Sequence, residues 1–311
     1  MSLKRPSGSA LNASGWVSIM TRTPKIINRL IIQVAALFAY NPFLHNFLTG
    51  ELYRGGSKYL CTPGLNCYSC PAAAASCPVG SLQAVLSGRN TITSTYVVGF
   101  LLLYGALFGR FICGYLCPFG LYQEALYRIP GRKLIPSRKV QMLGLLRYPI
   151  FFLLVVGAPL LVVDTFGNGT AGFCAWICPA GTLEAGIPLM LTQQSLRSLA
   201  GILFQWKLFV LILLSALSVV LYRPFCRFLC PLGLIYGWFN RISLHQIKID
   251  SSRCTTCGAC VSSCKLQISI HTNPGSSECI RCGDCARACP HGAISIGFDI
   301  PTSQARTVTR N

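Results

Sequence analysis

Two cysteine runs near the C-terminus have the spacing of an iron–sulfur protein. Each reads C-x2-C-x2-C-x3-C, and the second is followed by proline. In this bacterial pattern three thiolates of a run hold one cube, and the fourth belongs to the neighbouring cube. The spacing predicts two [4Fe–4S] clusters, one on Cys254, Cys257, Cys260 and Cys289 and one on Cys279, Cys282, Cys285 and Cys264. Zinc is the alternative, but zinc loops seldom repeat this spacing.

A second cysteine element recurs outside these runs. It reads Cys-Pro-x-Gly and begins at Cys77, Cys117, Cys178 and Cys230. The last three of these are each preceded, four residues earlier, by another cysteine: Cys113, Cys174 and Cys226. Such self-similarity indicates an internal repeat. Proline suits the first position of a helix, and glycine lets the backbone approach a cluster closely.

The repeats fall into two types. Segment 110–120 resembles segment 224–233, whereas segment 174–183 resembles the one that ends at residues 76–82. One [4Fe–4S] cluster takes four thiolates. The first type therefore predicts a third cluster on Cys113, Cys117, Cys226 and Cys230.

The second type leaves a choice of ligands for a fourth cluster. Six cysteines are available, and the preferred set is Cys70, Cys77, Cys174 and Cys178. Cys61 and Cys67 are then alternative ligands or a disulfide pair, which an oxidising compartment permits. Another interpretation places the cluster on Cys61, Cys67, Cys70 and Cys77, with Cys174 and Cys178 as a redox-active thiol pair. Buried thiols or disulfides are the remaining alternative, against which the fourfold recurrence argues.

Composition indicates that these cysteines lie in a membrane protein. The chain has 311 residues, 52% of them hydrophobic, and a mean hydropathy of +0.52. This is too apolar for an ordinary soluble protein. The net charge of +19 fits cytoplasmic membrane loops better than nucleic acid, because no basic run is interleaved with aromatic residues. No cleavable signal pattern precedes the first apolar run near Ile26.

Four apolar stretches are long enough to span a membrane, against the roughly 20 residues that one crossing needs, although the third is short. They are 26–48, 91–112, 148–163 and 201–222. Lysine and arginine gather before the first stretch, between the second and third, and after the fourth. Positively charged loops face the cytoplasm, so both termini are expected there.

The expected fold is an all-α polytopic membrane protein with about four transmembrane helices, re-entrant Cys-Pro loops and a small α+β ferredoxin domain with two clusters. Its predicted parts are a cytoplasmic segment 1–25, a membrane domain 26–244, a ferredoxin domain 245–297 and a tail 298–311. Glu124 and Glu184 are interpreted as interface carboxylates that pair with arginine or a helix N-terminus, and Arg110 and Lys207 as snorkelling anchors.

The cysteine motifs resemble those of the NapH/NosR-type family of membrane iron–sulfur proteins. That family is marked by C-x3-C-P motifs beside transmembrane helices and by a C-terminal double ferredoxin domain. Here the matching segments are 113–118, 174–179, 226–231 and the two C-terminal runs, so the resemblance covers most of the chain from about Tyr59. The cysteines of segment 61–77 and the pair Cys174/Cys178 go beyond the two-pair pattern of that family.

The expected function is electron transfer across the cell membrane through about four [4Fe–4S] clusters. The donor would be a cytoplasmic ferredoxin, flavodoxin or reductase, and the acceptor an extracytoplasmic redox partner. No nucleic-acid partner is expected. One alternative is quinol oxidation in the membrane, with quinone as an added cofactor. The other is a cluster-containing assembly or regulatory factor for another metalloenzyme.

Overall fold

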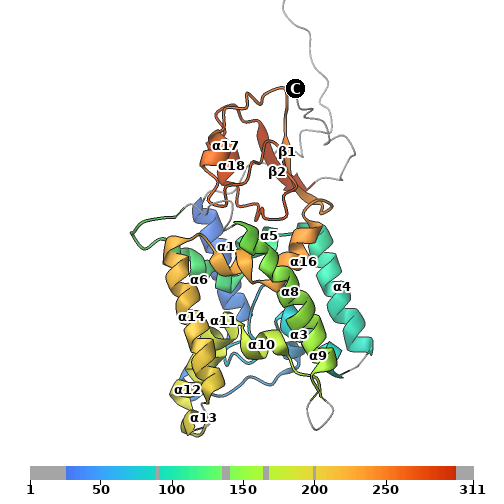
Figure 1. The fold of residues 1–311 in the computed structure, drawn as a ribbon, viewed down its shortest axis with the longest axis vertical. Coiled ribbons are helices and arrows are strands. Elements are labelled where there is room, and N and C mark those ends of the chain that lie inside the picture. The colour runs from blue at the N-terminus through green and yellow to red at the C-terminus, as the bar shows by residue number, and fades with distance from the viewer. Residues whose placement is uncertain (1–25, 89–90, 135–140, 164–167, 199–200, 299–311) are drawn as a thin grey trace, which may run out of the picture.

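The computed structural model describes residues 26–88, 91–134, 141–163, 168–198 and 201–298. The predicted segment 1–25, and the predicted tail apart from its first residue, lie outside these ranges. The described chain forms a helical body with a small domain at one end, and this domain carries the two C-terminal cysteine runs (Figure 1). The predicted combination of a helical body with a small α+β domain is confirmed.

Four helical runs cross the body in alternating directions (Figure 1). The first and third lead away from the small domain, and the second and fourth return toward it. They are α1 (Ile26–Tyr40), α4 (Thr91–Phe108), the continuous run η3 (Leu143–Leu146), α8 (Arg147–Pro149), η4 (Ile150–Gly157) and α9 (Ala158–Leu161), and finally α14 (Ile202–Val220).

Two of these runs are long and apolar enough to cross a membrane, Leu143–Leu161 and Ile202–Val220. They coincide with the predicted spans 148–163 and 201–222. In the described parts of the other two spans, the apolar helical stretches are shorter, Arg29–Tyr40 and Thr95–Phe108. Four membrane crossings therefore stay a prediction.

Local sequence explains why these two helices end before the apolar stretches do. α1 ends at Tyr40, just before the Asn41–Pro42 pair, because a residue that precedes proline is disfavoured in the helical region. α4 ends at Phe108, because Gly109 adopts a left-handed φ of 53°. A side chain at Gly109 would also meet Asn240 Oδ1 at 2.7 Å.

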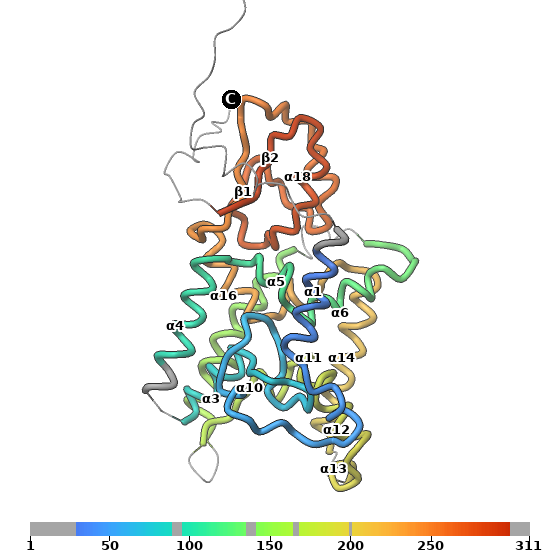
Figure 2. Tube along the Cα trace, turned by 180° about the vertical axis from the view of Figure 1, so that it is seen from behind, coloured from blue at the N-terminus to red at the C-terminus, as the bar shows by residue number. Residues whose placement is uncertain are grey.

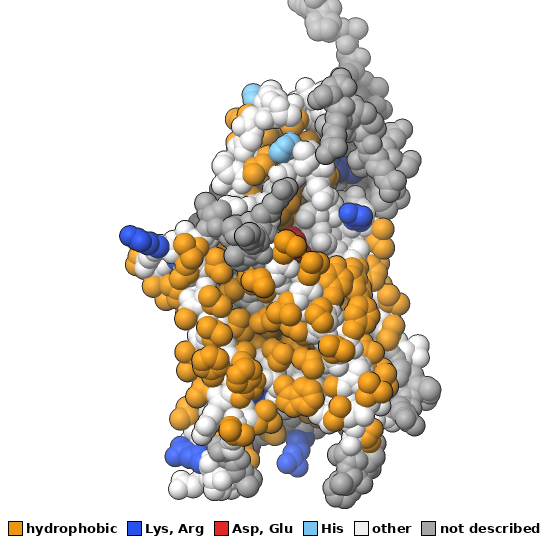
Figure 3. Space-filling view, viewed as in Figure 1, with side chains coloured by type: hydrophobic (Ala, Val, Ile, Leu, Met, Phe, Trp, Pro, Cys, Tyr) orange, Lys and Arg blue, Asp and Glu red, His pale blue; other side chains and the backbone are white. Residues whose placement is uncertain are grey.

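The face of the helical body seen in Figure 3 is apolar over most of its height. Large apolar side chains of the third and fourth runs face outward; Leu161 is 83% exposed and Ile202 is 84% exposed. Lysine and arginine side chains are seen at both ends of this apolar zone (Figure 3). An apolar surface of this extent is typical of a membrane or protein interface.

Pairs of short helices carry the Cys-Pro junctions inside the body. In each pair one cysteine lies in the first helix, and the second is the N-cap of the next helix, which begins with proline. The pairs are α5 (Phe111–Tyr115) with α6 (Pro118–Tyr127), α10 (Gly172–Trp176) with α11 (Pro179–Gly181), and α15 (Pro224–Phe228) with α16 (Pro231–Phe239). α3 (Pro78–Gly88) likewise begins directly after Cys77.

The remaining short elements lie mainly at the end of the body away from the small domain (Figure 1). They are α2 (Asn46–Thr49), η2 (Gly56–Tyr59), η5 (Thr182–Gly186), α12 (Ile187–Thr192) and α13 (Gln194–Ser198). After α1 the chain forms a long loop that rises back into the body before α3 (Figure 2).

The small domain is a two-stranded sheet with two short helices. β1 (His245–Ile249) pairs antiparallel with β2 (Ile294–Phe298), so the domain starts and ends on one ribbon. The cysteine loops lead into α17 (Ala259–Ser262) and α18 (Asp284–Ala288). Both loops take left-handed φ values at the same two positions, Thr256 and Gly258 in one and Arg281 and Gly283 in the other. The two runs therefore fold alike.

Candidate iron–sulfur sites

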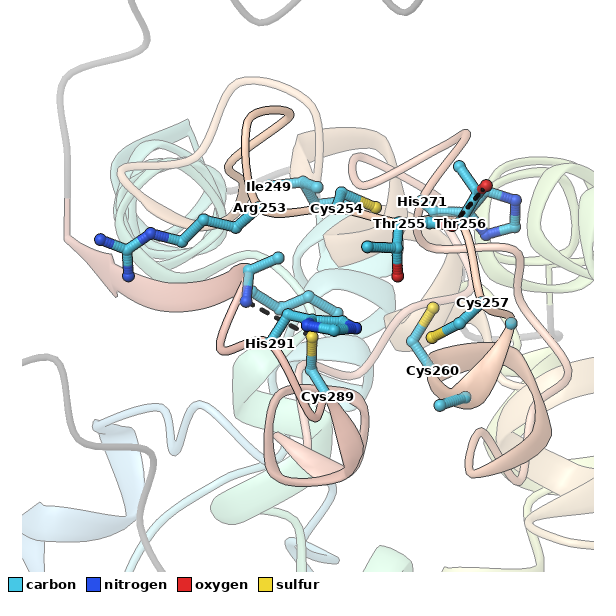
Figure 4. Close-up of a pocket in the computed structure, with 14 residues that line it drawn as sticks. Ile249, Arg253, Cys254, Thr255, Thr256, Cys257, Cys260, His271, Cys289 and His291 are labelled. Atoms are coloured by element: carbon cyan, nitrogen blue, oxygen red, sulfur yellow. Dashed lines mark hydrogen bonds between the residues drawn. The ribbon is translucent and has the colours of Figure 1, made fainter.

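The outermost candidate site lies at the far end of the small domain. Its four cysteines line one hollow between the two loops, and they are Cys254, Cys257, Cys260 and Cys289 (Figure 4). Cys257 is exposed, so this site is open to solvent. The structure thus brings the last cysteine of the second run to the first three of the other run.

The second candidate site of the domain lies against the helical body. The thiol of Cys285 is close enough to interact electrostatically with Cys279, Cys282 and Cys264. Cys264 therefore lies with the second run rather than with its own. Both sets have the crossed arrangement that the spacing predicts.

Substitution of the fourth cysteine of a run should alter the cluster that is held by the first three cysteines of the other run. Cys264→Ser is expected to change the EPR signal of the cluster on Cys279, Cys282 and Cys285, because it replaces that cluster's fourth sulfur. Cys289→Ser is the matched variant and should change the other cluster. An altered Cys254/Cys257/Cys260 cluster in Cys264→Ser would show that the pairing is not crossed.

Buried charges join the small domain to the helical body. Arg110 Nη1 lies 3.1 Å from Glu278 Oε2, and Arg147 pairs with the other oxygen of the same carboxylate. Arg110 also donates to the carbonyl of Cys226 over 3.0 Å. Burial raises the pKa of Glu278, but the two guanidinium groups outweigh burial and hold it below its usual value. Arg110 is only 2% exposed, so its interpretation as a snorkelling anchor is wrong.

The same contact brings the second run close to the body's cysteines. Asn240 donates to the carbonyl of Cys279 over 2.8 Å, and Tyr115 donates to the carbonyl of Cys282 over 3.3 Å. A side chain at Gly114 would meet the carbonyl of Ile280 at 2.5 Å. Glycine next to Cys113 is therefore needed for this close approach.

Four cysteines gather in the body directly beneath this contact. The thiol of Cys230 interacts electrostatically with those of Cys226, Cys113 and Cys117, and all four are buried. The members of this inner site come from α5, α15 and the N-caps of α6 and α16. The structure therefore brings together the four residues that the first type of repeat predicts as ligands.

A second group, the outer site, lies deeper in the body. The thiol of Cys178 interacts with those of Cys174, Cys67 and Cys77. A Cβ at Gly181 would lie 3.5 Å from Cys67 Sγ and 3.9 Å from Cys178 Sγ, while one at Gly80 would lie 3.8 Å from Cys174 Sγ. These distances are ordinary contacts, so both glycines lie directly beside the sulfurs of this group.

The other two cysteines of the long loop have different partners. Cys70 Sγ donates to Asn41 Oδ1 over 3.7 Å, and its carbonyl accepts from Lys58 Nζ over 3.2 Å. The Cys61 thiol bonds to Ser81 and Tyr96, and both Cys61 and Cys67 are free thiols. Cys67 interacts electrostatically with Cys77, whereas Cys70, which the preferred set includes, interacts with Cys67.

Each Cys-Pro-x-Gly element donates a backbone N–H to its own cysteine. The N–H groups of the four glycines meet the sulfurs of Cys77, Cys117, Cys178 and Cys230. Each sulfur also sits at the start of a helix, where partial positive charge stabilises an anion. All four positions therefore suit a thiolate ligand.

Two glutamines that sequence reasoning missed contact these sites. Gln83 Nε2 donates to Cys174 Sγ over 3.1 Å, and Gln123 Nε2 donates to Cys226 Sγ over 3.0 Å. The sequence could have pointed to these two glutamines, since each follows the cysteine of a Cys-Pro-x-Gly element by six residues.

The long loop and one tyrosine connect the inner and outer sites. Tyr236 is fully buried, interacts electrostatically with Cys113 and Cys77, and donates to the carbonyl of Pro63 over 3.0 Å. At the tip of the loop, a side chain at Gly64 would meet the carbonyl of Leu116 at 2.7 Å. Protein atoms therefore fill the space between the two groups of cysteines.

A buried charge cluster lies beside the inner site. Glu124 pairs with Arg29, and its Oε1 lies 3.3 Å from Arg223 Nη2. Tyr222 donates to the same carboxylate, and Gln33 donates to it over 3.0 Å. Burial raises the pKa of Glu124, but the arginines outweigh it and lower the pKa to about 2. The predicted pairing of Glu124 with arginine is confirmed.

The donor sets fit [4Fe–4S] clusters. Each of the four groups offers four thiol sulfurs, the number that such a cluster binds. Among the described residues, no three His, Cys, Asp or Glu side chains lie close enough to hold a single metal ion. A cube binds its ligands at four separate corners, so its ligands lie farther apart than those of one ion.

Family models for 4Fe–4S binding domains match the chain in both parts. One matches residues 90–136, 148–187 and 203–250, and the other matches residues 276–295. The first set of segments contains the three C-x3-C-P pairs, and the second lies in the small domain. The fold and sites thus define a ferredoxin-type 4Fe–4S electron-transfer protein.

Proteins of three organisms are similar to this chain over more than half of its length. An uncharacterized protein of Methanocaldococcus jannaschii is 28% identical over 62% of this chain and 74% of its own. The methylamine utilization ferredoxin-type protein MauN of Methylobacillus flagellatus is 29% identical over 60% of both chains. The ferredoxin-type protein NapH of Haemophilus influenzae is 25% identical over 58% of this chain and 56% of its own. No solved structure matches.

These matches show that the chain is similar to the ferredoxin-type proteins MauN and NapH and that it contains 4Fe–4S binding domains. The predicted resemblance and the predicted [4Fe–4S] cofactor are confirmed.

Proposed function

We propose that the protein carries electrons across a membrane, from a cytoplasmic donor to an extracytoplasmic acceptor, through [4Fe–4S] clusters bound at its four groups of cysteines. The observation that carries this proposal is the order of those groups. They follow one another from the exposed Cys257, through Cys282 and Cys113, to Cys178 deep in the helical body.

The contacts between neighbouring groups support a continuous path. Tyr115 and Cys282 are hydrogen-bonded at the junction between the small domain and the inner site. Tyr236 lies between the inner and outer sites. A cluster at each group would divide the roughly 30 Å of a bilayer's hydrocarbon core into shorter steps.

Charge and helix direction support the orientation of this path. In the proposed topology α1, α4, Leu143–Leu161 and α14 all cross the membrane, with the small domain in the cytoplasm. The alternating directions of these runs and their apolar surface fit this arrangement (Figures 1 and 3). The lysine and arginine bias of the loops predicts the same sidedness. The outer site would then be the one nearer the extracytoplasmic face.

Quinol oxidation is a second candidate function, and one hollow favours it. Arg29, Gln33, Glu124, Tyr222 and Asp284 are among the residues that line a small polar cavity between α1 and the small domain. Hydrogen-bonding side chains in such a cavity could orient a quinol head group. Rapid oxidation of the reduced protein by a quinone analogue, without any acceptor on the outer side, would favour this function.

Electron transfer across sealed vesicles tests the proposal. With the small domain outward and a membrane-impermeant oxidant inside, the reduced C-terminal clusters should become oxidised. Cys174→Ser and Cys178→Ser should abolish this oxidation, because they remove ligands at the outer site, and should leave the C-terminal clusters reducible. Detergent-opened vesicles provide the control, since the oxidant then reaches every cluster directly. Unchanged transfer in both variants would refute transfer through the outer site.

A further inference from the structure

The inner and outer sites share one construction. Each starts from a Cys-Pro-x-Gly cysteine at the beginning of a helix, Cys117 before α6 and Cys77 before α3. Each receives a C-x3-C pair from a later part of the chain, Cys226 and Cys230 in one and Cys174 and Cys178 in the other. Three of the four inner cysteines therefore have counterparts in the outer site.

The two glutamines make this correspondence specific. Gln123 donates to Cys226 Sγ and accepts a bond from the N–H of Phe225 over 3.1 Å. Gln83 donates to Cys174 Sγ and accepts a bond from the N–H of Phe173 over 3.0 Å. Each phenylalanine directly precedes the cysteine that the glutamine contacts, and both phenylalanines are fully buried. Chance would not reproduce both bonds at matching positions.

Only the fourth cysteine differs between the two sites. In the inner site it is Cys113, four residues before Cys117, but the residue four before Cys77 is Ala73. Cys67 fills this place from the long loop, since its thiol interacts with those of Cys77 and Cys178. The N–H of Cys67 donates to Glu184 Oε2 over 2.6 Å, which fixes this part of the loop.

We infer that the outer site is a second copy of the inner site and binds a [4Fe–4S] cluster through Cys67, Cys77, Cys174 and Cys178. Cys61 and Cys70 are not ligands. Gln83 and Gln123 are positioning residues with equivalent roles, each holding one ligand sulfur with its side-chain N–H. The inference rests on the proposed function, because it names the ligands of the site through which electrons would leave.

Iron content of the full chain, purified without oxygen, tests the ligand set. Cys67→Ser should lose about four iron atoms, one cluster's content, or keep them with a changed EPR signal. Cys70→Ser and Cys61→Ser are matched controls from the same loop and should keep both iron and signal. Loss or change in Cys70→Ser or Cys61→Ser, with Cys67→Ser unaffected, would overturn the assignment.

The glutamines give a readout that does not depend on removing a ligand. Gln83→Glu keeps an oxygen for the N–H of Phe173 but loses the N–H that faces Cys174. Hydrogen bonds to ligand sulfurs help to set a cluster's potential, and their loss should lower it. Redox titration of Gln83→Glu should show one membrane cluster shifted to lower potential, and Gln123→Glu should shift the other. A shift of the same cluster in both variants, or no shift in either, would contradict the shared construction.

These measurements are independent of transfer across the membrane. A protein with the proposed outer ligands but no vesicle transfer would refute the proposed function alone. Transfer that survives Cys67→Ser with full iron and an unchanged signal would refute the ligand set alone.

Discussion

Protein purified without oxygen is expected to contain about sixteen iron atoms and as much sulfide per chain, because each of four cysteine groups can hold one [4Fe–4S] cluster. Half of this iron should belong to the small domain and half to the helical body. Chemical iron and sulfide analysis, together with Mössbauer spectroscopy, measures both the total and the cluster type.

Double substitutions should show how much of this iron belongs to each site. Cys226→Ser with Cys230→Ser removes two inner ligands and should cost about four iron atoms, since two thiolates cannot hold the cube. Cys61→Ser with Cys70→Ser is the matched double variant and should retain the full content. A wild-type total near eight would mean that only the small domain carries clusters, and it would contradict the proposed path.

Glu124→Gln is expected to lower the free energy of unfolding by about 3–5 kcal/mol, the usual cost of breaking a buried ion pair. Arg29 and Arg223 are 6% and 1% exposed, so loss of the carboxylate leaves two guanidinium groups in an apolar environment without a counter-charge. Thermal unfolding in detergent, with iron content held equal, would measure the loss.

An exposed carboxylate provides the control for this variant. Glu51→Gln makes the same chemical change in an exposed residue, and it should alter stability by no more than about 0.5 kcal/mol. Equal effects of the two substitutions would show that the Glu124 cluster does not stabilise the body. Arg223 makes that outcome unexpected, because it holds a left-handed φ of 51°, which costs energy unless its contacts offset it.

Much of the fold follows from the sequence, because hydropathy and cysteine spacing are local properties. The apolar stretches 148–163 and 201–222 correspond to long helices, and β1 begins at His245. Hydropathy failed at the ends of α1 and α4, since an average over apolar residues does not register the breaks at Pro42 and Gly109.

The outer ligands could not be chosen from spacing, because the path of a loop depends on its tertiary contacts. Cys67 and Cys70 are three residues apart, and Cys70 is the ligand preferred from the sequence. Asn41 and Lys58 hold Cys70, while Glu184 holds Cys67 beside the other thiols. These partners come from up to 117 residues away.

The role of Arg110 was also beyond sequence reasoning. An arginine at the end of an apolar stretch is usually an anchor at the lipid surface. Here it is buried because the small domain docks on it and supplies Glu278 as its partner. Only the tertiary contact distinguishes these two situations.

The order of the cysteines along the chain has a consequence for biosynthesis. Cys77 belongs to the outer group, Cys117 to the inner, Cys178 to the outer and Cys230 to the inner, so the two groups are interleaved. Neither group is complete while only the first half of the chain has been made. If these groups bind clusters as proposed, a cluster can be inserted only after the later helices have joined the earlier ones, and it then ties an early segment to a late one. A nascent chain that stalls before residue 230 would leave the inner cysteines without their full set of partners.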